Sequence, residues 1–237
     1  RATGAEAFLN LTVQYNDADV SNVNESTLSM WRFNDSWTEI KDGIIDTDAN
    51  IVAVNSSQLG TFAPFADERP IVYRVNAGGT TTTALDNDTD WSGDTASAPS
   101  QYTNAIEADS KTYSTGDSIS LDGSVSSDTP AAVFQTERWD PSTDAEMQWA
   151  FPVEGGTTYE VRLYFAEVYF TQSGERVFDV AVENTLVLDD YDVYADVGHD
   201  TGTMKSFQVT PDSTLTVNFT REVENPNVNA IEIVKVA

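Results

Sequence analysis

An acidic run in the middle of the chain has the residue types of a cation-binding loop. In LDNDTDWSGD, residues 85–94, the side chains of Asp86, Asp88, Asp90 and Asp94 could supply the carboxylate oxygens that Ca²⁺ prefers. The run lacks the glycine at position six and the glutamate at position twelve of an EF-hand. In a chain with 39 acidic residues, a solvated loop is the better explanation. Ca²⁺ is therefore the one cofactor that the sequence leaves open, and no other is predicted.

Groups that could catalyse a reaction are few. His199, in DVGHDTG, is the only histidine, and the absence of cysteine excludes disulfides, thiolate catalysis and cysteine-ligated zinc. A lone histidine beside acids is more typical of a loop than of a Ser-His-Asp triad. Two suitably separated carboxylates can hydrolyse glycosides, but with 39 acids such a pair is expected by chance. We therefore predict that the protein is not an enzyme.

The stretch LYFAEVYF, residues 163–170, combines aromatic side chains with a single charge. If Phe165 faces the core, continued alternation would bury Glu167 as well. A buried carboxylate without a partner is strongly destabilising. Either the strand ends near Ala166, or Glu167 meets a cation such as Arg138 or Arg176.

If the strand ends there, Tyr169 and Phe170 lie on the following loop, where they could stack on the apolar faces of sugar rings. One ring that covers ~50–100 Å² of sugar stabilises a complex by about 1–2.5 kcal/mol, whereas association costs at least ~4 kcal/mol. A sugar site therefore needs further aromatic and polar side chains from other loops.

The charge of the chain limits its partners. Acidic residues outnumber basic ones 39 to 12, giving a formal net charge of −27, and they are spread along the sequence instead of forming a tail. This charge disfavours binding to nucleic acid and to anionic membranes, and no apolar run is long enough to insert into a bilayer. Together with the low lysine content, the acidic net charge favours a halophilic organism, in which salt near ~1 M shortens the Debye length to about 3 Å.

Six Asn-X-Ser/Thr sequons favour a glycosylated protein outside the cell. Single matches arise by chance in a chain rich in Asn, Ser and Thr, but their number points to a secreted or cell-surface protein. The candidate acceptors are Asn10, Asn24, Asn34, Asn55, Asn87 and Asn218.

Alternation of apolar and polar residues predicts strands in the first part of the chain. The predicted elements are half-buried strands over residues 9–15 and 51–54, and a hairpin over 28–40 that turns at Asn34-Asp35-Ser36. Prolines and charges just before residue 70 indicate a boundary. We therefore predict a small β-rich domain over residues 1–68, which could be a fragment of a larger module.

The second part, residues 70–237, shows the same period of two, which predicts strands with one face on the core. These strands cover residues 71–76, 159–166, 178–182, 215–219 and 229–236. Residues 80–132 show little periodicity, and because a compact domain seldom carries so long a loop, we expect short strands or turns there. No amphipathic helix of three turns is predicted. The expected architecture is all-β, with two antiparallel sheets packed face to face.

Six short motifs in the region 70–237 carry a family resemblance. They are VNAGG (75–79), QTERW (135–139), FAEVYF (165–170), RVFDV (176–180), LDDYDVYADVG (188–198) and NPNVNAIEI (225–233). Their order and spacing resemble those of the malectin domain. The resemblance implies an antiparallel β-sandwich of the galactose-binding-like kind, with the ligand site on loops at one end. It also implies lectin-like binding of glucose disaccharides, in a surface module or beside a glycan-degrading enzyme.

The resemblance also assigns candidate sugar-binding residues. The aromatic pair of the FAEVYF motif falls on Tyr169 and Phe170. Trp139 stands where the family has a tyrosine, which enlarges the stacking surface, and Glu224 stands where it has an aspartate, which moves the carboxylate. A further family tyrosine falls in a region that does not align, where the candidates are Tyr113 and Tyr102. The alternative is that the aromatic side chains simply pack under loops.

The segment before residue 70, with VQYNDADVSNVNESTLSMWRFNDSWTEI and TFAPFA, resembles a repeat of haloarchaeal surface proteins. We therefore predict a non-catalytic carbohydrate-binding module, with a glycan as partner, on an extracellular or cell-surface protein of a halophilic archaeon. The alternative is a structural or adhesive module that uses the same sandwich to bind other cell-surface proteins.

Overall fold

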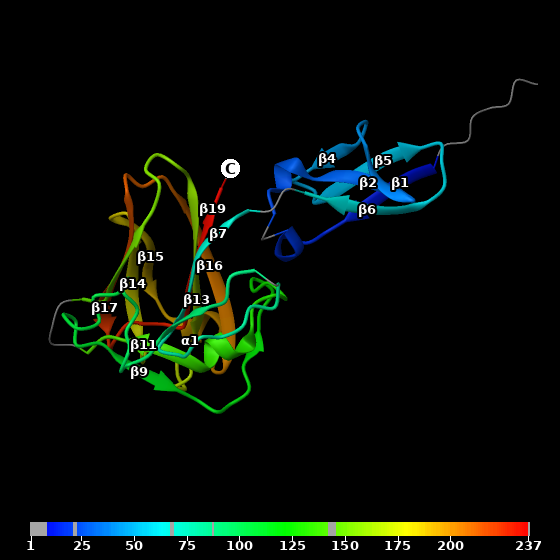
Figure 1. Ribbon diagram of the computed structural model, residues 1–237. Coiled ribbons are helices and arrows are strands. Elements are labelled where there is room, and N and C mark those ends of the chain that lie inside the picture. Colours follow the sequence, from blue (N-terminus) through cyan, green and yellow to red (C-terminus); the bar gives the residue numbers. More distant parts are fainter. Residues whose placement is uncertain (1–8, 21–22, 67–68, 87, 142–145, 237) are drawn as a thin grey trace, which may run out of the picture. The chain divides into compact units, whose positions relative to one another are not determined.

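The computed structural model describes residues 9–20, 23–66, 69–86, 88–141 and 146–236. The chain divides between Arg69 and Pro70 into two compact units (Figure 1), and each is described by itself. Asn87, one of the six sequon asparagines, lies outside the described residues. Within those residues, no helix is long and apolar enough to cross a membrane.

The N-terminal unit contains two three-stranded antiparallel sheets. One has the order β1-β5-β4, with β1 at Leu9–Gln14, β4 at Ile44–Asp46 and β5 at Ile51–Ser56. The other has the order β3-β2-β6, with β2 at Ser29–Asn34, β3 at Ser36–Ile40 and β6 at Thr61–Phe65. Short 3-10 turns, η1 (Asp17–Val20) and η2 (Glu25–Thr27), connect them. Met30, Val52 and Val54 are at the centre of its core.

The hairpin expected over residues 28–40 is confirmed. Phe33 pairs with Trp37, and Asn34 pairs with Ser36 across the turn. Asp35 takes the left-handed conformation, with φ of 65°, which aspartate tolerates better than most residues. The left-handed conformation that Asp35 tolerates therefore fixes the turn of this hairpin.

The C-terminal unit is a β-sandwich with a small third sheet. A six-stranded sheet has the order β10-β16-β13-β19-β7-β8, a four-stranded sheet the order β12-β17-β14-β15, and the small sheet the order β18-β11-β9. The strands are β7 (Ile71–Ala77), β8 (Ser92–Asp94), β9 (Lys111–Ser114), β10 (Ser120–Leu121), β11 (Thr136–Trp139), β12 (Gln148–Pro152), β13 (Tyr159–Ala166), β14 (Val177–Val182), β15 (Thr185–Tyr191), β16 (Thr201–Val209), β17 (Thr214–Val223), β18 (Asn227–Val228) and β19 (Ala230–Lys235).

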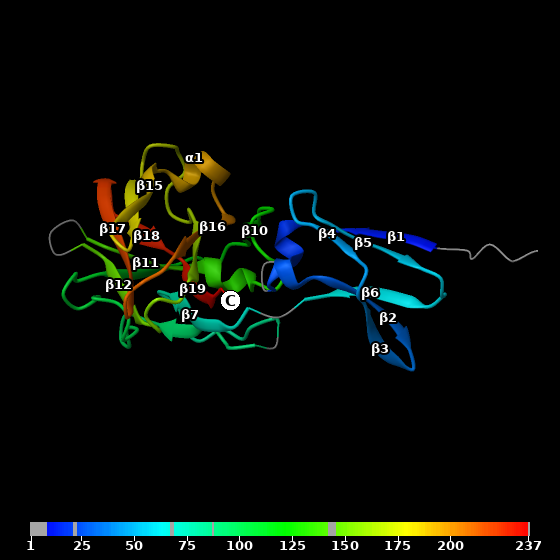
Figure 2. The ribbon, with the colours of Figure 1, turned by 90° about the horizontal axis from the view of Figure 1, so that it is seen from above.

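The two larger sheets enclose the main core, as the all-β expectation requires. Phe165 and Ile233 from one sheet and Phe178 and Phe219 from the other are fully buried in a single cluster. Figure 1 shows β14, β15 and β17 on one side of β7, β16 and β19, and Figure 2 shows the same layers from above. β9 and β11 lie at the lower end in Figure 1.

Two details of the sandwich differ from the expectation. β10 pairs with β16 and β8 pairs with β7 in parallel, so the six-stranded sheet is mixed at its edges instead of purely antiparallel. Both edge strands come from residues 80–132, where short strands were expected and where β8, β9 and β10 are found. The only α-helix in the described ranges is α1, Val193–Val197, and a 3-10 turn, η3, spans Ala131–Gln135.

β13 is buried on both faces, which corrects the prediction of a half-buried strand. On the face away from the main core, Trp91, Phe134 and Tyr164 form a second buried cluster under the 80–132 segment. The polar side chains of β13, which alternate with its apolar ones, are therefore buried as well. Enclosed charges need partners, because the protein interior does not solvate them.

A buried ionic network supplies these partners. The Glu232 carboxylate lies 2.6 Å from Arg74 Nε and 2.9 Å from Arg162 Nη1, and it accepts a hydrogen bond from the Tyr164 hydroxyl at 3.0 Å. Arg162 also pairs with Glu160 at 3.0 Å. Glu232 thus joins β7, β13 and β19 through one carboxylate.

We predict that Glu232→Ala destabilises the C-terminal unit by about 3–5 kcal/mol, because it removes the shared partner of two buried guanidinium groups. Denaturant unfolding followed by tryptophan fluorescence measures the change, since Arg74 lies 5.1 Å from the ring centroid of Trp91. Glu222→Ala, at an exposed position of β17, is the control. A loss in Glu232→Ala no larger than that in the control would contradict the prediction.

Candidate functional site

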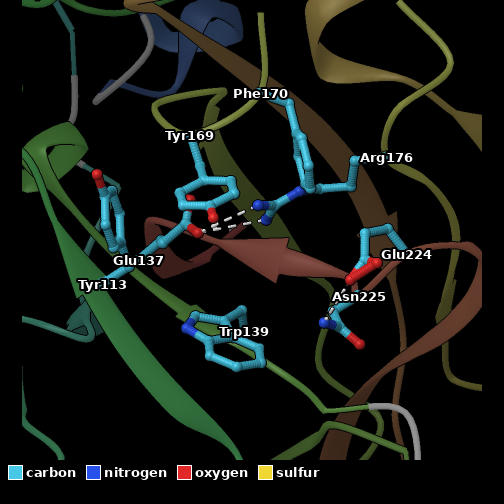
Figure 3. Close-up of a pocket in the computed structure, with 8 residues that line it drawn as sticks. All are labelled: Tyr113, Glu137, Trp139, Tyr169, Phe170, Arg176, Glu224 and Asn225. Carbon is cyan, nitrogen blue, oxygen red and sulfur yellow. Dashed lines mark hydrogen bonds and ion pairs between the residues drawn. The ribbon is translucent and has the colours of Figure 1, made fainter.

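A pocket of about 200 Å³ opens among the loops of the C-terminal unit. Its lining is mainly aromatic and charged, and Figure 3 shows these side chains around one hollow. The residues are Tyr113, Glu137, Trp139, Tyr169, Phe170, Arg176, Glu224 and Asn225. The structure therefore brings together the residues singled out in sequence as Tyr113, Trp139, Tyr169, Phe170 and Glu224.

The small sheet positions one side of the pocket. In the antiparallel pairing of β9 and β11, Tyr113 lies opposite Glu137. Trp139 follows Glu137 by two residues, so both side chains leave β11 on the same face. The intervening Arg138 points to the other face, where its Nε lies 2.6 Å from the buried Asp94 carboxylate. This pair fastens β11 to β8 and leaves Arg138 no role as a partner of Glu167.

Glu167 satisfies both alternatives that the sequence left open. β13 ends at Ala166, and the buried Glu167 carboxylate lies 3.1 Å from Arg176 Nε. Its other oxygen accepts hydrogen bonds from the backbone N–H groups of Tyr169 and Phe170, both at 2.9 Å. The charge that ends the strand therefore also shapes the turn that carries the aromatic pair.

The aromatic side chains contact one another edge to face. The Tyr169 ring lies 4.9 Å from that of Phe170 and 5.4 Å from that of Tyr113, centroid to centroid. The Arg176 guanidinium lies 5.2 Å from the Phe170 ring centroid. Tyr169 is 59% exposed, whereas Phe170, Tyr113 and Trp139 are half-buried. Tyr169 is therefore not packed under a loop.

Two carboxylates share one guanidinium at the bottom of the pocket. Glu137 is buried, its Oε1 lies 3.3 and 3.4 Å from the two terminal nitrogens of Arg176, and its Oε2 accepts a hydrogen bond from Asn227 at 2.7 Å. Burial raises the pKa of Glu137, and the neighbouring Glu167 charge acts in the same direction, although Arg176 opposes both effects.

Glu224 and Asn225 form the remaining edge. Glu224 is exposed, with φ of 58°, and accepts a hydrogen bond from Asn225 Nδ2 at 3.0 Å. Asn225 Oδ1 is buried and accepts no hydrogen bond from the described residues. The exposed Glu224 carboxylate thus leaves oxygen acceptors in the pocket.

Sequence reasoning missed Glu137, Arg176 and Asn225 as lining residues. All three stand inside motifs of the family resemblance, and that placement was the available signal. The alternative candidate Tyr102 is not part of the pocket, because its ring packs 5.0 Å from that of Phe151 against the core.

Four aspartates of the acidic run have partners within the protein. Asp86 pairs with Arg74 at 2.6 Å and Asp94 with Arg138. Asp90 accepts a hydrogen bond from the backbone of Ala84, and Asp88 accepts one from Thr89. Over the described ranges, no group of three or more acidic or histidine side chains could hold a metal ion. These carboxylates serve as arginine partners and turn caps.

The other described sequence candidates are not among the residues that line the pocket. Among the sequon residues, Asn10, Asn34 and Asn55 are exposed, whereas Asn24 and Asn218 are half-buried. His199 is a loop residue, as expected, and its Nδ1 lies 2.8 Å from the carbonyl oxygen of Phe170. Glycosylation of any sequon stays a prediction.

Residues 71–231 match the malectin domain family, which confirms the resemblance of the C-terminal unit. Mouse malectin is 41% identical over 69 residues, which are 29% of this chain and 23% of the mouse protein. Human malectin is 39% identical over 69 residues, with the same shares of each chain. The aligned part thus spans about a quarter of the length of these relatives.

Plant receptor ectodomains share the fold. The ANXUR2 extracellular domain of Arabidopsis thaliana has a TM-score of 0.62 at 18% identity, over 79% of this chain and 57% of its own. The plant peptide RALF23 in complex with FER and LLG2 gives 0.61 at 20% identity, over 78% of this chain and 57% of the matched chain. The chain therefore spans little more than half of these proteins, and at such identities the likeness concerns the fold alone.

We predict that the stability of wild type falls more steeply with rising pH than that of Glu137→Gln. Because the pKa of Glu137 is raised above its ordinary value of 4.5 in the folded state, the folded state holds the proton more tightly than the unfolded state. The stability this confers is complete below about pH 4.3 and is lost as the pH rises through the folded pKa. Glu137→Gln removes that loss.

Unfolding free energies from denaturant titrations, at steps between about pH 4 and 8, measure the difference. The stability of Glu137→Gln relative to wild type should rise with pH over this window. Glu224→Gln removes an exposed charge from the same pocket and is the control. Parallel curves for wild type and Glu137→Gln would exclude the effect.

Proposed function

Because this chain belongs to the malectin domain family, we propose that its C-terminal unit is a non-catalytic carbohydrate-binding module for a glucose-type di- or oligosaccharide. The observation that carries the proposal is the convergence of four aromatic side chains and an exposed carboxylate on one pocket. They are Tyr113, Trp139, Tyr169, Phe170 and Glu224.

The energetics support a site of several rings. One ring contributes about 1–2.5 kcal/mol of stacking, and association costs at least ~4 kcal/mol, so contacts from several rings are needed to meet the cost that one cannot. At about 200 Å³ the pocket is smaller than the ~300–1,000 Å³ of sites for larger ligands. We infer that it encloses one sugar ring and leaves the next residue of the chain at the rim.

The polar groups of the pocket suit a neutral sugar. The carboxylate oxygens of Glu224 can accept hydrogen bonds from hydroxyl groups. Arg176, the cation of the lining, already contacts two carboxylates and is poorly placed to bind an anionic sugar. Stacking supplies the affinity and these acceptors orient the ring.

We place this module outside the cell, on a secreted or surface protein of a halophilic archaeon. The charge of −27 and the exposed sequons support that setting. Molar salt would screen the repulsion among the 39 acidic residues. Binding is therefore best measured at salt near ~1 M.

Trp139→Ala and Tyr169→Ala should each raise the Kd by about tenfold or more, because each removes one stacking ring. Calorimetric titration with maltose and with cellobiose measures the loss, and stability should change little, since Tyr169 is 59% exposed. Trp37→Ala, an aromatic truncation in the N-terminal unit, is the control. A glycan array at high salt with no ligand for the wild-type protein would count against the proposed function.

A second candidate function is protein–protein adhesion through the N-terminal unit. On the face of the β3-β2-β6 sheet, Phe33, Trp37 and Phe65 are 44%, 40% and 43% exposed. The Trp37 ring lies 5.4 Å from that of Phe33 and 5.0 Å from that of Phe65, and the rings are tilted by 58° and 84°. Exposed aromatic clusters of this kind are typical of protein interfaces.

If this patch mediates self-association, sedimentation velocity at salt near ~1 M should give a defined oligomer. Phe33→Ser and Phe65→Ser should then shift the protein to a monomer while sugar binding is retained. Leu59→Ser, at an 85% exposed position of the same unit, controls for the loss of an apolar surface residue. A wild-type monomer at all concentrations would remove self-association from consideration.

A further inference from the structure

The aromatic pair of the pocket lies on a loop, residues 167–176, that connects β13 to β14. Side-chain carboxylates within the loop hold its backbone. Glu167 accepts from Tyr169 and Phe170, and Glu175 accepts from the N–H groups of Thr171 and Gln172 at 3.1 and 3.0 Å. These bonds define the turns of the loop. The ion pair of Glu167 with Arg176 joins the two ends of the loop, and Arg176 connects them to Glu137 of the pocket.

The far side of the loop is fastened by Asp192, which precedes α1. One carboxylate oxygen accepts hydrogen bonds from the backbone N–H of Gly174 at 2.6 Å and from the Ser173 hydroxyl at 2.8 Å. The other accepts from the N–H of Ala195 at 2.9 Å and caps the N-terminus of α1. One side chain therefore links the helix to the loop.

His199, which follows α1, fastens the first part of the loop, at Phe170. Its Nδ1 lies 2.8 Å from the carbonyl oxygen of Phe170. A carbonyl oxygen only accepts, so Nδ1 carries the proton and donates it. The backbone N–H of Asp200 also donates to the carbonyl oxygen of Glu167 at 3.0 Å. The loop is thus held from both ends of α1.

We propose that Asp192 and His199 are positioning residues of the carbohydrate site, which clamp the loop through α1 so that Tyr169 and Phe170 face the pocket before the ligand arrives. This inference rests on the proposed function. Packing alone does not fix Tyr169, which is 59% exposed. A five-residue helix is too short to be stable by itself. The hydrogen bonds on either side of α1 therefore do more than cap the helix, because they also hold the loop.

The clamp affects affinity through pre-organisation. A loop that is already ordered pays no ordering entropy when the sugar binds, whereas a loosened loop does. The alternative is that Asp192 is only a helix cap and His199 only a loop residue, in which case their loss would change local stability but not the order of residues 169–174.

Matched substitutions separate these possibilities. Asp192→Ser keeps a preferred N-cap for α1 but is too short to reach the Gly174 N–H as well. His199→Leu removes the donor to Phe170, whereas His199→Asn places an amide N–H near the position of Nδ1. Asp196→Asn changes a side chain of α1 that contacts Lys205 and Tyr191 instead of the loop, and it is the control.

The experiment measures maltose affinity and amide hydrogen exchange on the same samples. Asp192→Ser and His199→Leu should raise the Kd about three- to tenfold, the range expected for one lost hydrogen bond. Both should also speed exchange at the N–H groups of Tyr169, Phe170 and Gly174. His199→Asn and Asp196→Asn should resemble wild type in both measurements.

The two proposals fail in distinguishable ways. If wild-type protein does not bind maltose or cellobiose, the proposed function fails, and the exchange rates still test the clamp. If exchange of the loop amides is unchanged in Asp192→Ser and His199→Leu, or if His199→Asn behaves like His199→Leu, the clamp is overturned. The clamp is likewise overturned if wild type binds maltose and both disruptive variants bind it equally well.

Discussion

The ion pair between Glu167 and Arg176 is the constraint on which the pocket depends. Glu167 is buried where β13 ends, and a buried charge without partners is strongly destabilising. The partners it takes also build the site. Two of them are the backbone N–H groups of Tyr169 and Phe170, and the third, Arg176, reaches Glu137 at the bottom of the pocket. The contacts that satisfy the Glu167 charge therefore position both the aromatic pair and the ion pair of Arg176 with Glu137.

The same logic governs the rest of the C-terminal unit. In a chain with 39 acidic and 12 basic residues, half of the arginines are buried against carboxylates: Arg74, Arg138, Arg162 and Arg176. Attraction between opposite charges is much stronger in the interior than in water. These four guanidinium groups thus pair with carboxylates in the interior. The excess acidic residues remain at the surface, where water and salt solvate them.

Much of the fold was predictable because its signals are local. Alternation with a period of two records which residues share a face of a strand, and it marked β1, β5, β7, β13, β14, β17 and β19 but missed β12, β15 and β16. The Asn34-Asp35-Ser36 turn set the first hairpin, and the charge at Glu167 marked the end of β13. The pocket residues Tyr169 and Phe170 followed from that interruption, whereas Trp139 and Glu224 came only from the family resemblance.

The sequence by itself determined many of the strands, the turn of the first hairpin, the family and the aromatic pair at the end of β13. Only the tertiary structure decided that both faces of β13 are buried and that Tyr113 and not Tyr102 lines the pocket. It also decided that Asp86 and Asp94 of the acidic run pair with arginines. Periodicity says which side chains share a face, but not what covers that face. The partner of a buried charge, such as Arg138 for Asp94, comes from a strand distant in sequence, and no local pattern records it.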